Sequence, residues 1–464
     1  MRRAGAPPPP NGATAAVKQG TDGQVVVKRT STVEEDLKYY DPVTSVGIFF
    51  LYPPIGAQRV NMGRELYLTS AVFKSAMDEC DAIATPLLPQ PLVQVLYPDA
   101  VDEPMYRDVI NQVEFAMPCL FAVEYALTAL WISEGCRPHY VIGHSLGEFV
   151  AAVTANLISL EVALSIVCER ARLMSELGSK GSMMAVRAPR EVVAAAIDRV
   201  SRPLREQAAL ASANSPESVV ISGSWVALRA ALRELPPGIK TQRVLASHPD
   251  HSPLMEPICG PLAAYAKRRY ASCPPPLRTD GQPTFVRFAS TVTGGVARAD
   301  AVADPEYWAA HFRGTVEFEA GLKALLAEHA ARADAPNSQY EMGRRGFLIE
   351  MGDGMLCRLA TEVVGGDPAM RKAGLEAVSS MPRSPPKGAD TDGVAQVTLG
   401  AIEGVMAHVR HERYSRYVFE PEMFRKWNID EGYYLPGMDL GEPTRADEAD
   451  QCAGGCTPHR AGGA

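Results

Sequence analysis

The feature that most constrains the fold is a serine between a short apolar run and a long helical pattern. The run 140–142 is typical of a buried strand, and it leads into Gly143-His144-Ser145-Leu146-Gly147. A helical pattern of apolar residues then extends from Gly147 to Leu177. Gly-x-Ser-x-Gly between a strand and a helix is the context of a nucleophile elbow, a tight turn that exposes the serine hydroxyl. The helix N-terminus behind it offers free N–H groups. The segment therefore predicts an α/β fold with Ser145 as nucleophile.

The rest of the chain repeats this alternation of strands and helices. The apolar run 46–52 is bounded by two prolines and is typical of a strand in a parallel sheet. Between about 181 and 249 the pattern changes to two strand-like segments, 183–186 and 218–223, and two helix-like segments, 191–200 and 225–235. This predicts a small α+β subdomain at 181–249, inserted into a large subdomain formed by 45–180 and 250–410.

Composition limits the location of the chain and its partners. Residues 1–44 and 411–464 are polar or rich in Gly, Pro and Ala, and we expect a disordered N-terminal extension and a partly disordered C-terminal one. The net charge of -8 argues against nucleic-acid binding, and the apolar runs are too short and too interrupted for a membrane span. Nine irregularly spaced cysteines favour a reducing compartment. The cytoplasm is expected, with organellar targeting left open by the lack of acidic residues before Asp22.

A nucleophilic serine needs a base, and the chain has nine histidines. His144 adjoins the serine. His248, His251 and His311 remain equal candidates on the residue pattern alone. Cys452, Cys456 and His459 do not have the spacing of known zinc sites, and no metal is expected.

Several motifs in one order resemble those of the malonyl-CoA:acyl carrier protein transacylase family, which includes the acyltransferase domains of fatty-acid and polyketide synthases. The similar segments cover about residues 46–410. They are Gly143-His144-Ser145-Leu146-Gly147-Glu148, Arg170-Ala171-Arg172-Leu173-Met174, Asn214-Ser215-Pro216, His251-Ser252-Pro253-Leu254-Met255, Ser290-Thr291-Val292-Thr293-Gly294, Tyr307-Trp308 and Glu350-Met351-Gly352. The resemblance implies a large α/β-hydrolase-like subdomain with a parallel sheet and a small inserted ferredoxin-like α+β subdomain.

The resemblance also implies a role for each matching position. Ser145 would form the acyl-enzyme, with His251 as its base. The backbone carbonyl of His311 would hold the imidazole. The backbone N–H groups of Ile55 and Leu146 would form the oxyanion hole, and His144 would be a supporting residue. Arg170 would bind the carboxylate of a malonyl group.

The implied reaction moves a malonyl group from malonyl-CoA to an acyl carrier protein that acts in trans, for fatty-acid or polyketide synthesis. Coenzyme A and the phosphopantetheine arm would be substrates, no cofactor would be retained, and a monomer is expected.

Three positions depart from the family pattern. Ile55 replaces the first Gln of a Gly-Gln-Gly-x-Gln loop, and Met117 replaces a Gln that lines the acyl pocket. Asp250, in His248-Pro249-Asp250-His251, puts a negative charge near the carboxylate site, where the malonyl-selective pattern His-Ala-Phe-His has Phe. These departures put the preferred acyl group and the activity in question.

Two alternatives therefore remain. One is a serine esterase or acyl hydrolase, which the elbow alone would allow, although such enzymes place their histidine near the C-terminus and would leave Arg170 unexplained. The other is a catalytically weak module that docks carrier proteins, which the three departures favour. Hydrolysis without a carrier would indicate the first, and carrier binding without an acyl-enzyme would indicate the second.

Overall fold

The computed structural model describes residues 16–19, 25–28, 46–178, 181–244, 246–275, 286–298, 300–333, 345–371, 373–381 and 398–407. Within residues 1–44, strands β1 (Ala16–Gln19) and β2 (Val25–Lys28) pair antiparallel, and the disorder expected of this extension stays a prediction. The three consecutive valines of β2 favour an extended backbone. The predicted C-terminal extension at 411–464 lies outside the described residues.

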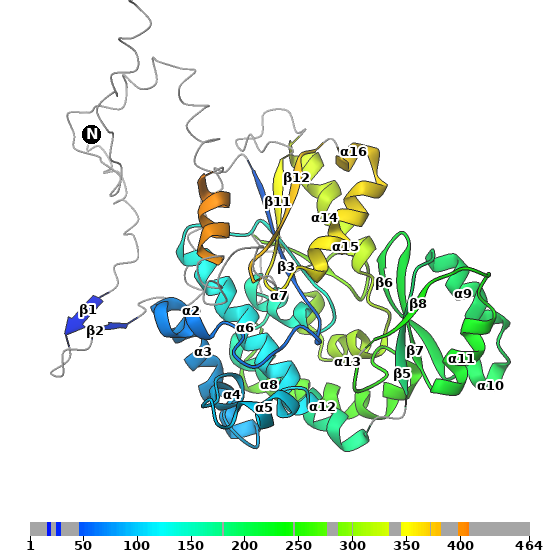
Figure 1. Cartoon of the computed structure of the whole chain (residues 1–464), viewed down its shortest axis with the longest axis horizontal. Coiled ribbons are helices and arrows are strands. Elements are labelled where there is room, and N and C mark those ends of the chain that lie inside the picture. The colour runs from blue at the N-terminus through cyan, green and yellow to red at the C-terminus, as the bar shows by residue number, and fades with distance from the viewer. Residues whose placement is uncertain are drawn as a thin grey trace, which may run out of the picture. The chain divides into compact units, whose positions relative to one another are not determined.

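A six-stranded, mostly parallel sheet forms the centre of the fold (Figure 1). The strand order is β10 (Gly295–Val296), β9 (Arg287–Ser290), β4 (Tyr140–Gly143), β3 (Gly47–Tyr52), β11 (Gly346–Glu350) and β12 (Leu375–Ser379). Neighbouring strands run parallel except β10, which is antiparallel to β9. The predicted α/β class with a parallel-rich sheet is therefore confirmed.

The alternation of β3 explains why helices cover both faces of this sheet. Ile48, Phe50 and Tyr52 join one apolar cluster, and the intervening Phe49 and Leu51 join another. Successive side chains of a strand point to opposite faces, so a strand that is apolar throughout must be covered twice. The first cluster contains residues of α3 (Ala71–Ala84), α6 (Val113–Ser133), α7 (Gly147–Thr154), α8 (Leu160–Leu177), α12 (Glu256–Ser272) and α13 (Glu306–Arg313). The second contains residues of α14 (Phe318–Ala333) and α15 (Met355–Gly366).

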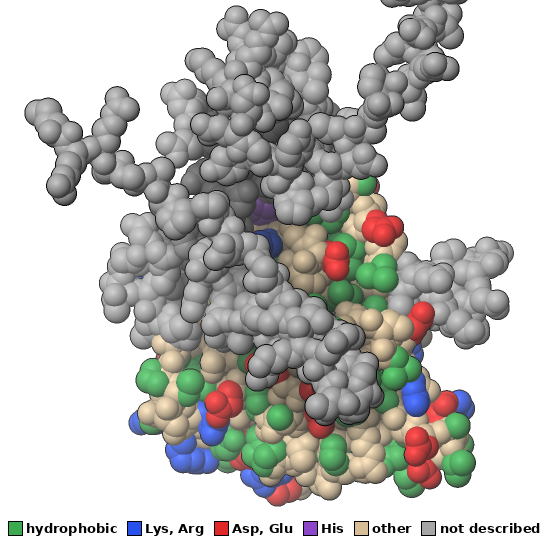
Figure 2. Space-filling model, turned by 90° about the vertical axis from the view of Figure 1, so that its left-hand side faces the viewer, with side chains coloured by type: hydrophobic (Ala, Val, Ile, Leu, Met, Phe, Trp, Pro, Cys, Tyr) green, Lys and Arg blue, Asp and Glu red, His purple; other side chains and the backbone are tan. Residues whose placement is uncertain are grey.

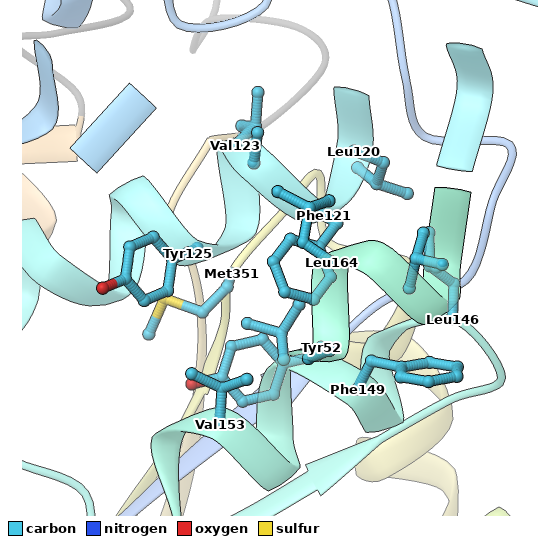
Figure 3. Packing of buried hydrophobic residues seen from close by; sticks show 14 of the residues in the cluster. Tyr52, Leu120, Phe121, Val123, Tyr125, Leu146, Phe149, Val153, Leu164 and Met351 are labelled. Atoms are coloured by element: carbon cyan, nitrogen blue, oxygen red, sulfur yellow. The ribbon is translucent and has the colours of Figure 1, made fainter. Parts of the chain in front are cut away.

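The core beside β3 is formed largely by α6. Phe121 of α6, Leu164 of α8 and Tyr52 of β3 lie together there, with Leu146 and Phe149 beside them (Figure 3). By length and composition α6 could cross a membrane, but its apolar window is wholly buried inside the fold. Its hydrophobicity is thus explained by packing between α3 and α8.

A second, four-stranded antiparallel sheet occupies the predicted insertion. Strands β5 (Ser182–Val186), β6 (Ala208–Ser215), β7 (Ser218–Gly223) and β8 (Thr241–Val244) take the order β6-β7-β5-β8. The helices between them are α9 (Arg190–Arg199), α10 (Arg202–Arg205) and α11 (Trp225–Arg233) (Figure 1). This connectivity and strand order are those of a ferredoxin-like unit, which confirms the predicted fold of this part.

Direct bonds link the small sheet to the segment that follows α13. Ser212 of β6 and Val316 form an isolated parallel bridge, and the Thr315 hydroxyl donates to the carbonyl of Leu210 at 2.7 Å. The edge strand of the small sheet is therefore fixed beside residues 314–316.

Acidic and basic side chains are interspersed over the described part of the face shown in Figure 2. Of the ion pairs, Lys74–Asp78, Arg107–Glu103 and Arg202–Glu206 join residues four apart on one helix. Such exposed pairs contribute at most about 1 kcal/mol each. The buried sheets and helices, not these pairs, therefore hold the site in place.

Candidate active site

The turn at Ser145 has the strained geometry that an elbow requires. Ser145 has φ 52°, in the left-handed region that side-chain-bearing residues rarely adopt. A Cβ on Gly143 would lie 2.0 Å from the backbone nitrogen of Glu148, and one on Gly147 would lie 2.2 Å from the carbonyl oxygen of Tyr52. Both positions therefore require glycine. The turn brings α7 directly against β3 and presents the serine side chain beside the helix N-terminus.

The hydroxyl of Ser145 is hydrogen bonded to the imidazole of His251, with 2.7 Å between Oγ and Nε2. On the other side of the ring, Nδ1 lies 2.9 Å from the carbonyl oxygen of Gly314. A carbonyl only accepts, so Nδ1 carries the proton and Nε2 is free to accept from the serine. Burial, followed by the charge of Arg170, lowers the pKa of His251 to about 3. The imidazole is therefore neutral at physiological pH, the form that a general base needs.

The carbonyl bonded to His251 differs from the predicted one. We expected the carbonyl of His311, but the 2.9 Å hydrogen bond goes to Gly314. Gly314 follows the last residue of α13, where carbonyls lack partners within the helix, so its oxygen is free to turn toward the imidazole. The backbone of His311 makes only a smaller contribution to the pKa of His251 than Gly314 does.

The side chain of His311 lies beside a buried carboxyl group, that of Glu148. Its Nε2 lies 3.6 Å from Oε2 of Glu148, and burial lowers the pKa of His311 well below its ordinary value. Glu148 also accepts from the backbone N–H of Thr291 at 3.1 Å and from the hydroxyls of Thr291 and Tyr307. Burial raises the pKa of Glu148 to about 7. The network fixes α7 against β9 and α13. The sequence feature that could have indicated this network is Glu148, which directly follows the Gly-x-Ser-x-Gly motif.

His144 faces the small sheet. Its Nε2 lies 2.8 Å from Oδ1 of Asn214, at the end of β6. An amide oxygen accepts, so Nε2–H donates, and burial lowers the pKa of His144 to about 4. Asn214 was not among the predicted site residues, although it lies in the Asn-Ser-Pro motif. The bond joins the elbow to the small sheet.

The two predicted oxyanion-hole residues lie in the turns that follow β3 and β4. Leu146 is the residue before α7, and Ile55 lies half-buried in the turn after β3. The polar anchoring of the Ile55 turn is retained through Gln58, the second Gln position of the motif. Gln58 accepts from the Gly56 N–H at 2.6 Å and donates to Asn111 at 3.2 Å. The loss of Gln at position 55 thus leaves the turn fixed.

Arg170 is buried on α8, with 1% of its side chain exposed. Its guanidinium stacks over the ring of Phe312, 4.3 Å from the centroid, and lies 3.8 Å from the carboxylate of Asp250. None of its three nitrogens has a hydrogen-bond partner among the described residues. Burial lowers the pKa of Arg170 to about 10, which leaves it charged at physiological pH. A buried cation with unused donors is suited to binding an anionic group.

Two other candidates from the sequence, Met117 and His248, take no part in the Ser145–His251 hydrogen bond. Met117 is buried in α6, and its place against an acyl group stays a prediction. His248 pairs with the Ser247 hydroxyl at 2.9 Å. Within the described ranges, no group of three or more His, Cys, Asp and Glu could hold a metal ion. Cys452, Cys456 and His459 lie outside those ranges.

The fold and the site together define an α/β protein with a serine elbow and a ferredoxin-like insertion. The sequence profile of the acyl transferase domain matches residues 49–342. The chain belongs to the acyl transferase domain family.

Individual relatives agree with this assignment. Polyketide synthase GfsB of Streptomyces halstedii is 35% identical over 312 residues, which is 66% of this chain and 5% of the relative. The chain thus spans a small part of that protein. The solved acyltransferase domain from the second module of the salinomycin polyketide synthase is 30% identical, with a TM-score of 0.60 over 77% of this chain and 72% of that one. The acyltransferase domain of SpnD, in complex with 2-(pent-4-yn-1-yl)malonyl, is 28% identical, with a TM-score of 0.61 over 77% of this chain and 76% of that one.

Proposed function

We propose that this acyl transferase moves a malonyl-type acyl group from coenzyme A to the phosphopantetheine thiol of an acyl carrier protein through an acyl-enzyme on Ser145. The observation that carries the proposal is the hydrogen-bonded Ser145–His251 pair in a fold that also holds the buried, unbonded guanidinium of Arg170. The Ser145–His251 pair supplies a nucleophile, and the guanidinium of Arg170 supplies a partner for a carboxylate. The malonyl derivative bound to the SpnD domain supports this class of acyl group.

The first half-reaction forms the acyl-enzyme. The Ser145 hydroxyl gives its proton to Nε2 of His251 as its oxygen attacks the thioester carbonyl. The backbone N–H groups of Leu146 and Ile55 stabilise the oxyanion that forms. The intermediate then expels the coenzyme A thiolate, which takes the proton from His251. The carrier thiol reverses these steps and leaves with the acyl group.

This chemistry also leads to proposals about the substrates and the partner protein of the enzyme. Coenzyme A and phosphopantetheine enter as substrates, and every step uses side chains and backbone groups of the chain, without a retained cofactor. The carrier protein acts in trans. A monomeric state and a cytoplasmic location stay predictions.

Intact-mass measurement tests the acyl-enzyme directly. Protein exposed to malonyl-CoA should gain one malonyl mass, the modified peptide should contain Ser145, and Ser145→Ala should gain none. Addition of a phosphopantetheinylated carrier should move that mass to the carrier. Failure of Ser145 to be acylated by malonyl-, methylmalonyl- or acetyl-CoA would refute the proposal.

The same experiment separates the two alternatives. Rapid release of free malonate without a carrier, together with no transfer when a carrier is added, would indicate an acyl hydrolase. Carrier binding without any acyl-enzyme would indicate a docking module, the alternative favoured by Ile55, Met117 and Asp250. The intact Ser145–His251 bond argues against that second alternative.

A further inference from the structure

The carboxylate of Asp250 lies beside the guanidinium that is proposed to bind the substrate anion. Asp250 is buried, its Oδ2 lies 3.8 Å from Nη2 of Arg170, and its Oδ1 has no hydrogen-bond partner among the described residues. The two groups are near enough to attract each other and too far apart to form a close hydrogen bond. Each therefore retains capacity for a third group.

The histidines and the thiol near this pair add no charge. The pKa values of His251, in the next position, and of His311, on α13, are lowered by burial, so both rings are neutral. Cys259, on α12, has its pKa raised to about 11 by burial and is a neutral thiol. Glu148 contacts His311 and carries its own hydrogen bonds. The charges that face Arg170 are thus those of Asp250 and of the incoming substrate.

A charge count shows what malonyl binding requires. Arg170 and ionised Asp250 are together neutral, so a bound carboxylate would leave one uncompensated negative charge beside two buried side chains. Two carboxylates in such a site do not both ionise, and one retains a proton. Protonated Asp250 would restore neutrality and could donate its proton to the substrate carboxylate, which Arg170 binds from the other side.

We propose that Asp250 binds the malonyl carboxylate in its protonated form, so that wherever Asp250 is ionised in the free enzyme, loading of each malonyl group brings one proton into this site. The inference rests on the proposed function, because it concerns the same acyl-enzyme. Burial already raises the pKa of Asp250 to about 6, so less free energy is needed to protonate it near neutral pH than for an exposed aspartate. An acetyl group has no carboxylate and requires no such proton.

The test compares acylation of Ser145 by malonyl and acetyl thioesters of N-acetylcysteamine between pH 5 and 8.5. These thioesters lack the phosphates of coenzyme A, one of which titrates in this range. The ratio of the two kcat/KM values cancels any titration shared by both reactions. We expect the malonyl-to-acetyl ratio to be constant below about pH 6 and to fall by up to about tenfold per pH unit above it.

Two variants make the assignment specific. Asp250→Asn keeps the shape of the side chain, cannot ionise and should give a ratio independent of pH, with malonyl loading at pH 8 faster than in the parent. Asp78→Asn makes the same chemical change on the exposed face of α3, and we expect it to leave the falling ratio unchanged.

The outcomes separate the inference from the proposed function. Normal acylation with a flat ratio in the parent chain, or an equal slope in Asp250→Asn, would overturn the role of Asp250 alone. No acylation by either thioester at any pH would overturn the proposed function and the inference with it. If Asp250→Asn does not fold, the ratio of the parent chain decides.

Discussion

At the scale of single residues, the site pairs a serine with a histidine that is oriented by a neutral carbonyl. The Gly314 carbonyl fixes the tautomer of His251, which a carboxylate does in many serine enzymes. A carbonyl stabilises the imidazolium less than a carboxylate would. The base therefore stays weakly basic and releases its proton readily.

Replacement of His251 tests this role. We expect His251→Gln to slow acylation of Ser145 by about 10²–10⁴-fold, because general-base assistance is lost while the volume of the side chain is nearly kept. Rapid-quench intact-mass measurement gives the rate, and thermal unfolding shows whether the fold is kept. An unchanged rate in a folded variant would show that another group activates the serine.

The pH profile with an acetyl substrate tests the protonation state of the same residue. The pKa of His251 is lowered to about 3, so the imidazole stays unprotonated as the pH falls from 8 to 5. We expect kcat/KM for an acetyl thioester to be level over this range. A decline centred near pH 6.5, the ordinary value of a histidine, would show that burial does not lower the pKa as described.

Removal of the guanidinium tests the carboxylate site. We expect Arg170→Ala to slow malonyl loading by about 100-fold or more, because a buried charge-assisted pair is lost. Acetyl loading should fall far less. The ratio of the two rates measured on one preparation checks this, and an equal loss for both substrates would contradict the role of Arg170.

The sequence allowed prediction of the side chains of this site better than prediction of its backbone partners. Ser145, His251 and Arg170 belong to motifs and could be named from the residue pattern and the family resemblance. Gly314 could not, because the availability of a carbonyl depends on where α13 ends, and any residue can supply one. The contact of Asp250 with Arg170 could not be predicted either, because it depends on how residues 246–255 pack against α8.

At the scale of elements, the close contact of β3, β4 and α7 sets the position of the nucleophile. Glycines at 143 and 147 permit this contact, and Phe149 stacks on Trp308 of α13 with 3.8 Å between ring centroids. Such a pair contributes about 0.5–1.5 kcal/mol beyond its buried area. The elbow is therefore held from the sheet side and from the helix that leads to Gly314.

A pair of glycine variants tests the packing of the elbow. In Gly147→Ala the new methyl group would meet the Tyr52 backbone at 2.2 Å, which cannot be relieved without moving β3 or α7. We expect a loss of more than about 3 kcal/mol in the free energy of unfolding. The control is Gly260→Ala, inside α12 with open space around the new atom, which should stabilise by about 0.5–1 kcal/mol. Urea unfolding of both variants shows whether their free energies of unfolding change in opposite directions.

The strand-turn-helix elements were predictable because their apolar patterns are local. Periodicity alone placed β3, β4, β5 and β7. The strand orders β10-β9-β4-β3-β11-β12 and β6-β7-β5-β8 depend on pairings across long separations, which local patterns do not encode. The β1–β2 hairpin was missed because the high Gly, Pro and Ala content around it obscured two four-residue strands.

At the scale of the whole molecule, two sets of buried groups oppose each other in the pH dependence of stability. Burial lowers the pKa of five histidines among the described residues, His139, His144, His248, His251 and His311. It raises the pKa of four carboxyl groups, Glu124, Glu148, Asp250 and Glu350. The histidines destabilise the fold as the pH falls below about 6.5, because only the unfolded chain binds their protons. The carboxyl groups destabilise it as the pH rises above about 4.5, because only the folded chain keeps theirs.

These opposing contributions predict that the free energy of unfolding is nearly constant at mildly acidic pH and falls steeply at lower pH. Between about pH 4.5 and 6 the two sets nearly offset each other. Below about pH 4 the carboxyl groups are protonated in both states, and each histidine lowers the free energy of unfolding by about 1.4 kcal/mol per pH unit until its folded-state pKa. Urea unfolding from pH 3 to 8 measures the curve. A steady fall that begins at pH 6.5 would contradict the offset.

The spacing of the site along the chain has a consequence for how activity appears during synthesis. The hydroxyl at 145 leaves the ribosome before the ferredoxin-like insertion, the imidazole at 251 follows that insertion, and the carbonyl at 314 comes last. A nascent chain that stops before residue 314 holds a serine and a histidine whose ring has lost the acceptor that selects its tautomer. Catalytic competence should therefore arise late, no earlier than the translation of Gly314.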